Sequence, residues 1–165
     1  MAAISLVFAT ASSVAASQSA TWGWATDTDN PMSFFFGIPY AGCERATLTV
    51  PNSGSTGTIT ATTRTSIVIG PGAQCSGSNL PSSLNAFTLR TRAYVLRNGY
   101  LVVGCSTPMV YNSSGQGVIT ASTGSNCQKT SSADATWTVR GVYGWWDYDD
   151  ARWRSETVNQ PAIAD

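Results

Sequence analysis

The chain has 165 residues, of which 11% are charged, whereas charged residues make up about a quarter of a typical soluble domain. Its formal net charge is zero, so it lacks the basic excess with which proteins bind nucleic acid or anionic membranes. It contains no histidine, which excludes Ser-His-Asp and Cys-His nucleophiles and every zinc site that uses histidine. We therefore expect a non-enzymatic domain with no cofactor and no nucleic-acid partner.

The basic residues are spread along the sequence. For residues scattered in this way we expect solvated strand edges and local ion pairs, and not a binding stripe. They are Arg45, Arg64, Arg90, Arg92, Arg97, Arg140, Arg152 and Arg154, with Lys129 as the single lysine.

Residues 1–16 are uncharged, apolar and rich in small residues. The run from Ile4 to Val14 has the length of a signal-peptide hydrophobic region, and small residues follow it at a suitable cleavage position. We predict a signal peptide over 1–16, with residue 20 as the alternative end, and no membrane insertion after cleavage. No basic residue precedes the run, which departs from the usual pattern. The alternative is a strand that adds to the sheet of a neighbouring subunit.

The four cysteines indicate disulfides, because no pair has the C-x-x-C spacing that a zinc site would need. We favour the pairs Cys43–Cys75 and Cys105–Cys127, since each closes a local loop. Disulfides form in oxidising compartments. Together with the signal peptide they predict a secreted, extracellular protein.

Apolar residues alternate with polar ones in several short stretches, including 46–50, 58–62 and 136–143. This period of two predicts strands with one buried face. Turns rich in glycine and serine separate the stretches, and helical periodicity is absent after residue 20. We predict an all-β single domain over 21–160, built as an antiparallel β-sandwich with two disulfides, and a frayed tail over 161–165. A closed β-barrel is the alternative.

Asn98-Gly99 lies between two apolar runs, Phe87–Arg97 and Tyr100–Val103, and is a strong hairpin signal. The two-residue loop predicts a register in which Tyr94 stands opposite Val103. Both faces of the hairpin tip are apolar, so both are covered or one is a contact surface. We also predict a hairpin between residues 109–111 and 118–120, and a last strand over 152–158.

Residues 144–156 concentrate aromatic and acidic side chains in a further predicted hairpin. Aromatic rings can stack on the apolar faces of sugar rings while acids and arginines bind the hydroxyls. A secreted β-sandwich with this set resembles a carbohydrate-binding module in architecture. The competing interpretation is that the tryptophans fill the core and the acids pair with arginines. The predicted ligand-binding residues are Trp145, Trp146, Asp147, Tyr148, Asp149, Arg152 and Trp153.

The acids of the same segment allow two weaker interpretations. Asp147, Asp149 and Asp150 offer oxygen ligands for calcium, but the remaining positions of the EF-hand loop pattern are absent. These acids and Glu156 could also supply the carboxylate pair of a glycoside hydrolase. We rank hydrolysis third.

Carbohydrate recognition at a cell surface is therefore the first functional hypothesis. The second is a protein-interaction or assembly subunit, an adaptor in an extracellular complex such as a filament, a coat or a secreted toxin particle. An exposed apolar patch, or an N-terminal strand that leaves the fold, would mark this second function.

Overall fold

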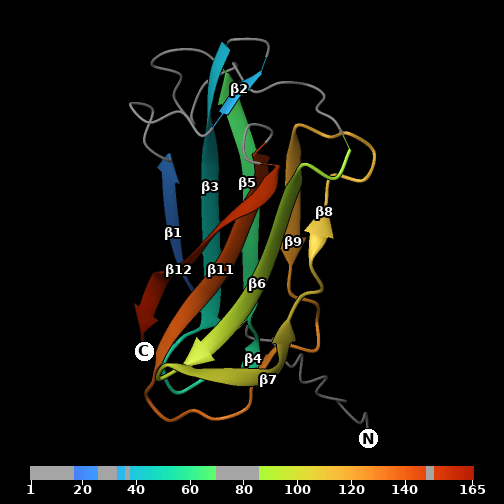
Figure 1. The fold of residues 1–165 in the computed structure, drawn as a ribbon. Helices are drawn as coiled ribbons and strands as arrows, with labels where there is room; N and C mark the ends of the chain where they lie inside the picture. The colour runs from blue at the N-terminus through green and yellow to red at the C-terminus, as the bar shows by residue number, and fades with distance from the viewer. Residues whose placement is uncertain (1–16, 26–32, 36–37, 70–85, 148–150) are drawn as a thin grey trace, which may run out of the picture.

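A computed structural model describes residues 17–25, 33–35, 38–69, 86–147 and 151–165. These residues form strands that pair antiparallel throughout (Figure 1). Within these ranges no helix is long and apolar enough to cross a membrane. The strands are β1 (Ser17–Ala25), β2 (Ser33–Phe35), β3 (Ile38–Pro51), β4 (Gly57–Thr58), β5 (Thr60–Ile69), β6 (Leu89–Arg97), β7 (Tyr100–Ser106), β8 (Val110–Tyr111), β9 (Val118–Ser122), β10 (Gln128–Lys129), β11 (Thr136–Asp147) and β12 (Arg152–Ala164).

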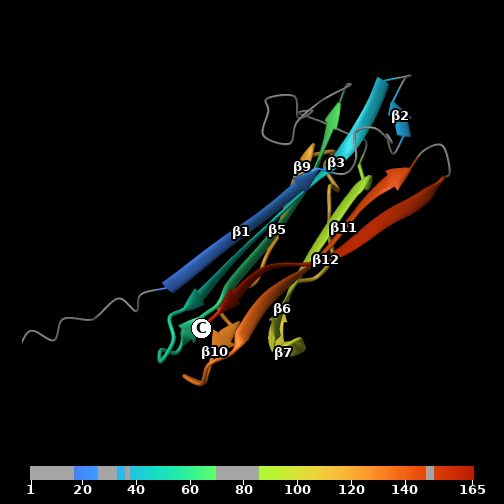
Figure 2. The ribbon, with the colours of Figure 1, turned by 90° about the vertical axis from the view of Figure 1, so that its left-hand side faces the viewer.

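The strands form two larger sheets and one small one. The first sheet has the order β1-β3-β5-β9, with β2 paired to β3, and the second has the order β12-β11-β6-β7, with β8 paired to β6. Strands β4 and β10 form the small sheet. Figure 2 shows the two larger sheets as separate layers. The predicted all-β class with antiparallel sheets is confirmed, and the closed-barrel alternative is wrong because no sheet closes on itself.

The core lies between the two layers. Leu48 and Val50 of β3 pack in one buried cluster with Val95 of β6 and Val139 of β11. Each of these side chains contributes about 1.5–3 kcal/mol to folding through removal of its apolar surface from water. The threonines that alternate with the buried residues of β3 point outward, as the period of two predicts.

The hairpin of β6 and β7 follows the predicted turn. Asn98 (φ 49°) and Gly99 (φ 83°) both have left-handed backbone conformations, as a type I′ turn requires. The first two pairs have the predicted register, but Tyr94 then stands opposite Ser106 and not opposite Val103. Gly104 has a φ of 79°, which allows β7 to bulge between these pairs.

The second predicted hairpin does not form. Residues 110–111 lie in β8, which pairs with β6 of the second sheet, whereas residues 118–122 form β9, which pairs with β5 of the first sheet. The segment between them therefore crosses from one layer to the other. Alternation identified both strands, but it carries no information about which sheet a strand joins.

The C-terminal residues are part of the sheet and do not fray. Strand β12 continues to Ala164, and Pro161 and Ile163 are buried. The backbone amides and carbonyls of Asp165 and Ala135 exchange two hydrogen bonds, of 3.1 and 3.3 Å. At the other end, residues 17–20 belong to β1, and the predicted signal peptide over 1–16 lies outside the described residues.

Lys129, the single lysine, is buried at the end of the small sheet. Its ammonium donates hydrogen bonds to the backbone oxygens of Pro51 (3.2 Å) and Asn52 (3.1 Å) and forms an ion pair with the carboxylate of Asp165. Burial raises the pKa of Asp165, but hydrogen bonds from Lys129, Ala135 and Trp137 outweigh it and lower that pKa below its usual value. The buried charge is thus fully partnered.

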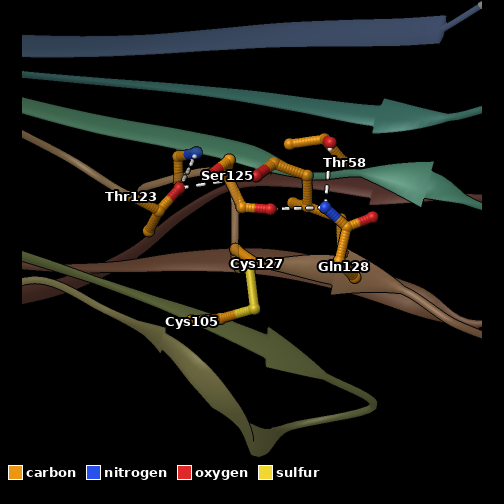
Figure 3. The surroundings of a disulfide bond; sticks show 8 residues. Thr58, Cys105, Thr123, Ser125, Cys127 and Gln128 are labelled. Carbon is orange, nitrogen blue, oxygen red and sulfur yellow. Dashed lines mark hydrogen bonds between the residues drawn. A yellow bond between two sulfur atoms is a disulfide. The ribbon is translucent and has the colours of Figure 1, made fainter.

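The described residues contain one disulfide, Cys105–Cys127, where two were predicted. Cys43 is buried in β3, and Cys75 lies outside the described residues. Figure 3 shows that the disulfide joins β7 of the second sheet to the turn that precedes β10. Gln128 holds this turn by donating hydrogen bonds to the Thr58 hydroxyl (2.9 Å) and the Ser125 carbonyl (2.5 Å).

Replacing Cys105 and Cys127 together by serine should lower the free energy of unfolding. The disulfide spans a sequence separation of 22 residues, and the loop-closure entropy for that separation corresponds to about 3 kcal/mol. Urea unfolding of the wild type and the double variant, without reductant, measures the difference. A double variant that unfolds at the wild-type urea midpoint would show that the cross-link contributes nothing.

Candidate binding face

Trp145 and Trp146 are consecutive in β11 and therefore point to opposite faces of the second sheet. Trp145 is 4% exposed and packs in the core with Ile67, Leu89 and Ile119. Trp145 thus belongs to the interior, in agreement with the competing interpretation that the tryptophans of this segment fill the core. Trp146 is only partly buried and lies on the outer face.

Asp147 shares the inward face of β11 with Trp145 and is buried. Its carboxylate accepts a hydrogen bond of 2.5 Å from Nε of Arg154. A buried carboxylate held in an ion pair is not available to an outside ligand, and loss of its partner would leave an uncompensated buried charge. Arg152 stands opposite Asp147 at the exposed start of β12.

Four aromatic rings form a continuous row on the outer face of the second sheet. We call Trp146, Trp153, Tyr111 and Phe87 the aromatic row. Trp146 and Trp153 are direct partners in the β11–β12 ladder, with ring centroids 5.8 Å apart. Trp153 lies 6.0 Å from Tyr111, and Tyr111 lies 6.2 Å from Phe87. These spacings are those of favourable edge-to-face and tilted ring contacts.

Arg90 of β6 lies against the aromatic row. Its guanidinium carbon is 4.4 Å from the centroid of the Trp153 ring, and its Nη2 donates a hydrogen bond of 2.5 Å to the Ser155 hydroxyl. The space for this side chain comes from Gly144, where a Cβ would lie 2.8 Å from Nε of Arg90. A cation over an indole ring is attracted by the negative face of the ring, so Arg90 and Trp153 hold each other in place.

Asn112 positions the exposed end of the row. Phe87 has a φ of 59°, which is unfavourable by about 1–2 kcal/mol for a residue with a side chain. The Asn112 carbonyl accepts a hydrogen bond from the amide of Phe87 (3.2 Å), and its side-chain oxygen accepts from the amides of Thr88 (2.7 Å) and Leu89 (2.8 Å). These bonds hold Phe87 beside Tyr111. The side chain of Asn112 is fully buried.

The structure brings together two of the predicted ligand-binding residues, Trp146 and Trp153. Tyr148 and Asp149 lie outside the described residues. So does Asp150, which with Asp147 and Asp149 forms the weak calcium candidate. Within the described ranges no group of His, Cys, Asp and Glu side chains is arranged to hold a metal ion. Phe87, Tyr111 and Arg90 were missed, because the pairing of β8 with β6 that joins them to the tryptophans is not visible in the sequence.

A separate polar cluster lies between the layers. Glu44 of β3 is 2% exposed, and neither of its carboxyl oxygens has a hydrogen-bond partner within the described part of the chain. Burial, and then the charge of Glu156 on β12, raises the pKa of Glu44 to about 8. Burial also raises the pKa of Glu156, and burial and the charge of Glu44 raise the pKa of the Tyr143 hydroxyl. Glu44 is therefore mostly protonated at neutral pH.

Glu44 was not among the predicted residues, although a signal for it exists. It has the same strand parity as Ala46 and Leu48, which points it into the core. The carboxylate pair predicted for hydrolysis includes Glu156 and takes the other acid from Asp147, Asp149 and Asp150. Of these, Asp147 is engaged by Arg154, and the acid beside Glu156 is Glu44.

Comparison with known protein families, curated proteins and solved structures finds no match. The chemistry of the aromatic row and of the Glu44 cluster is therefore what bears on the function. The aromatic row presents partly exposed ring faces with an arginine and a hydroxyl beside them, which suits an amphipathic ligand. The Glu44 cluster holds a carboxyl group with a raised pKa in the interior, which makes the stability of the fold depend on pH.

Proposed function

We propose that this protein is a non-enzymatic carbohydrate-binding domain and that the aromatic row is its contact surface. The supporting observation is the continuity of the row. Four rings from β8, β11, β12 and the turn before β6 touch in sequence, while Phe87 and Tyr111 remain 59% and 38% exposed. Exposed apolar surface gathered in one place marks a binding site more often than scattered surface does.

The polar groups around the row suit a sugar. Aromatic rings offer flat apolar surfaces to the C–H faces of pyranose rings. Arg90, whose guanidinium lies over the Trp153 ring, and the Ser155 hydroxyl that it contacts offer polar groups beside them. Because Arg90 and Trp153 already hold each other, binding would cost little side-chain entropy. A disulfide is compatible with the secreted, extracellular location that we propose for such a domain.

Replacing Trp153 by alanine should weaken glycan binding by about tenfold or more, since central tryptophans carry a large share of binding energy. A glycan array followed by calorimetry on the bound glycans measures the change. Tyr100→Ala is the matched control, because Tyr100 is an aromatic residue 80% exposed on β7, away from the row. A wild-type protein that binds no glycan, or a Trp153→Ala variant that binds as well as Tyr100→Ala, would refute the proposal.

A second candidate function is assembly with another protein through β7. This strand lies at the edge of the second sheet and exposes Tyr100, Leu101 (55%) and Val103 (94%). Exposed apolar edge strands are surfaces on which chains pair. Association of the wild type in sedimentation velocity that Tyr100→Ala abolishes would favour this candidate.

A further inference from the structure

We infer that the ligand of the aromatic row is an acidic polysaccharide, whose carboxylates are bound by three arginines that extend from the row along the outer face of the second sheet. This inference rests on the proposed function and names the ligand class of the same site. The three residues, which we call the arginine column, are Arg90, Arg92 and Arg140. Arg140 is distant from Arg90 and Arg92 in the sequence, but all three lie on one face of the second sheet.

The pairing of β6 with β11 brings the column together. In this ladder Arg90 stands opposite Gly144, Arg92 opposite Val142, and Arg140 opposite Tyr94. Arg90 and Arg92 are two residues apart on one strand and share its outer face, so their Cα atoms are about 7 Å apart. Arg140 is the diagonal neighbour of Arg92 on the next strand, at about 7–8 Å.

Uncharged groups hold each arginine of the column. Arg90 lies over Trp153, the guanidinium carbon of Arg92 is 4.5 Å from the Tyr94 ring centroid, and Nε of Arg140 donates a hydrogen bond of 3.0 Å to Asn159. Within the described part of the chain none of the three forms an ion pair. The Nε atoms of Arg90 and Arg92 are buried and that of Arg140 is bonded to Asn159, so the donors for the two oxygens of a carboxylate are the Nη groups.

The acids of the described residues lie elsewhere. Glu44, Asp147 and Glu156 belong to the inward-facing positions of their strands. Asp165 pairs with Lys129, and Asp134 accepts a hydrogen bond from Ser53. Like charges on neighbouring strand positions destabilise a sheet. Three neighbouring arginines without an acid among their described contacts therefore point to negative charge supplied by a ligand.

The observations favour a polysaccharide over a nucleic acid. A row of aromatic rings beside arginines can also bind single-stranded nucleic acid. However, single-stranded nucleic acid carries a phosphate on every nucleotide and is bound in a positively charged groove that tracks its backbone, and a chain with a formal net charge of zero and a pI near 6.1 has no such general basic excess. Carboxylates on a sugar chain need only the local charge of the arginine column. A polysaccharide with one carboxylate per sugar and uncharged ring faces matches both the column and the row.

The test compares acidic polysaccharides with their uncharged counterparts. Polygalacturonate, alginate and hyaluronan are each offered to the wild-type protein beside the carboxyl-reduced form of the same polymer, with calorimetry as the measurement. We expect at least one acidic polymer to bind. Its reduced form should bind at least about tenfold more weakly, because a charge-assisted contact is lost. Binding of the acidic polymer should weaken as salt rises.

Single substitutions distinguish the contribution of the arginine column to binding from that of the aromatic row. Arg92→Gln and Arg140→Gln should each weaken binding of the acidic polymer by about tenfold and leave binding of the reduced polymer unchanged. The matched control is the double variant Arg45→Gln, Arg64→Gln, because these two arginines stand opposite each other in the first sheet. This control should bind like the wild type.

Each other outcome is decisive. Equal binding of acidic and reduced polymers would overturn the ligand class and leave the proposed function standing. Binding of neither form of any of the three polymers would overturn this inference, and the glycan array would still decide the proposed function. Binding that Trp153→Ala does not weaken would overturn the proposed function and this inference together. Tighter binding of single-stranded DNA than of any polysaccharide would assign the face to nucleic acid and overturn the inference.

Discussion

Replacing Glu44 by glutamine should abolish most of the loss of stability that the wild-type protein shows as the pH rises from about 5 to about 8. Below this range the Glu44 carboxyl is protonated in both the folded and the unfolded protein. Within it, the unfolded chain releases the proton near the ordinary pKa of 4.5, whereas the folded protein keeps it up to a pKa of about 8. Rising pH therefore favours the unfolded state.

The expected size follows from the difference between these two pKa values. A shift from 4.5 to about 8 corresponds to about 5 kcal/mol of unfolding free energy, since one pKa unit is about 1.4 kcal/mol. Glutamine has nearly the same shape and no charge to release, so the variant should show a much flatter profile.

Urea unfolding at about pH 5, 7 and 9 measures both profiles. Glu156→Gln serves as the control, because Glu156 is only the second cause of the Glu44 shift, after burial. That variant should keep most of the wild-type slope. A wild-type profile that is flat over this range, or a Glu44→Gln profile with the wild-type slope, would show that Glu44 is ionised in the folded protein.

Alanine at Trp145 should lower the free energy of unfolding by about 3–5 kcal/mol, the usual cost of removing a large aromatic side chain from a core. Trp145 is 4% exposed and packs against Ile67, Leu89 and Ile119, so its loss leaves a cavity between the layers. Alanine at Trp146, one residue later on the outer face, should cost much less because its surroundings are partly solvent.

Two measurements on the Trp145→Ala and Trp146→Ala variants distinguish an effect on stability from an effect on glycan binding. Urea unfolding should separate the variants in the stated order, while calorimetry with the bound glycan should show the loss of affinity in Trp146→Ala. The folded fraction of Trp145→Ala should retain the wild-type affinity. Equal destabilisation by both substitutions would contradict the assignment of the two side chains to opposite faces.

The parts of the fold that depend on local pattern could be predicted. Alternation located β3, β5 and β11 and their buried residues, and Asn98-Gly99 located the turn between β6 and β7. The partner of each strand could not be predicted in the same way. Residues 109–111 and 118–120 are predicted to form one hairpin, but the strands found there, β8 and β9, pair with different sheets. The contacts that decide this pairing are distant in the sequence.

The candidate site shows the same division. Alternation along β11 places Trp145 and Trp146 on opposite faces of the sheet, so the sequence alone could have predicted that one of them is buried. The aromatic row and the arginine column were not, because both arise from the β6–β11 and β6–β8 ladders. Residues that the sequence scatters, such as Arg92 and Arg140, become neighbours only through this pairing.

Because Lys129 is buried and ion-paired, reagents that acylate amines should leave the described part of the folded protein unmodified. The positively charged side chains on its surface are then guanidinium groups. Dicarbonyl reagents that attack guanidinium groups would therefore map this surface selectively. A bound ligand would register as slower modification of Arg92 and Arg140, read by mass spectrometry on unaltered wild-type protein.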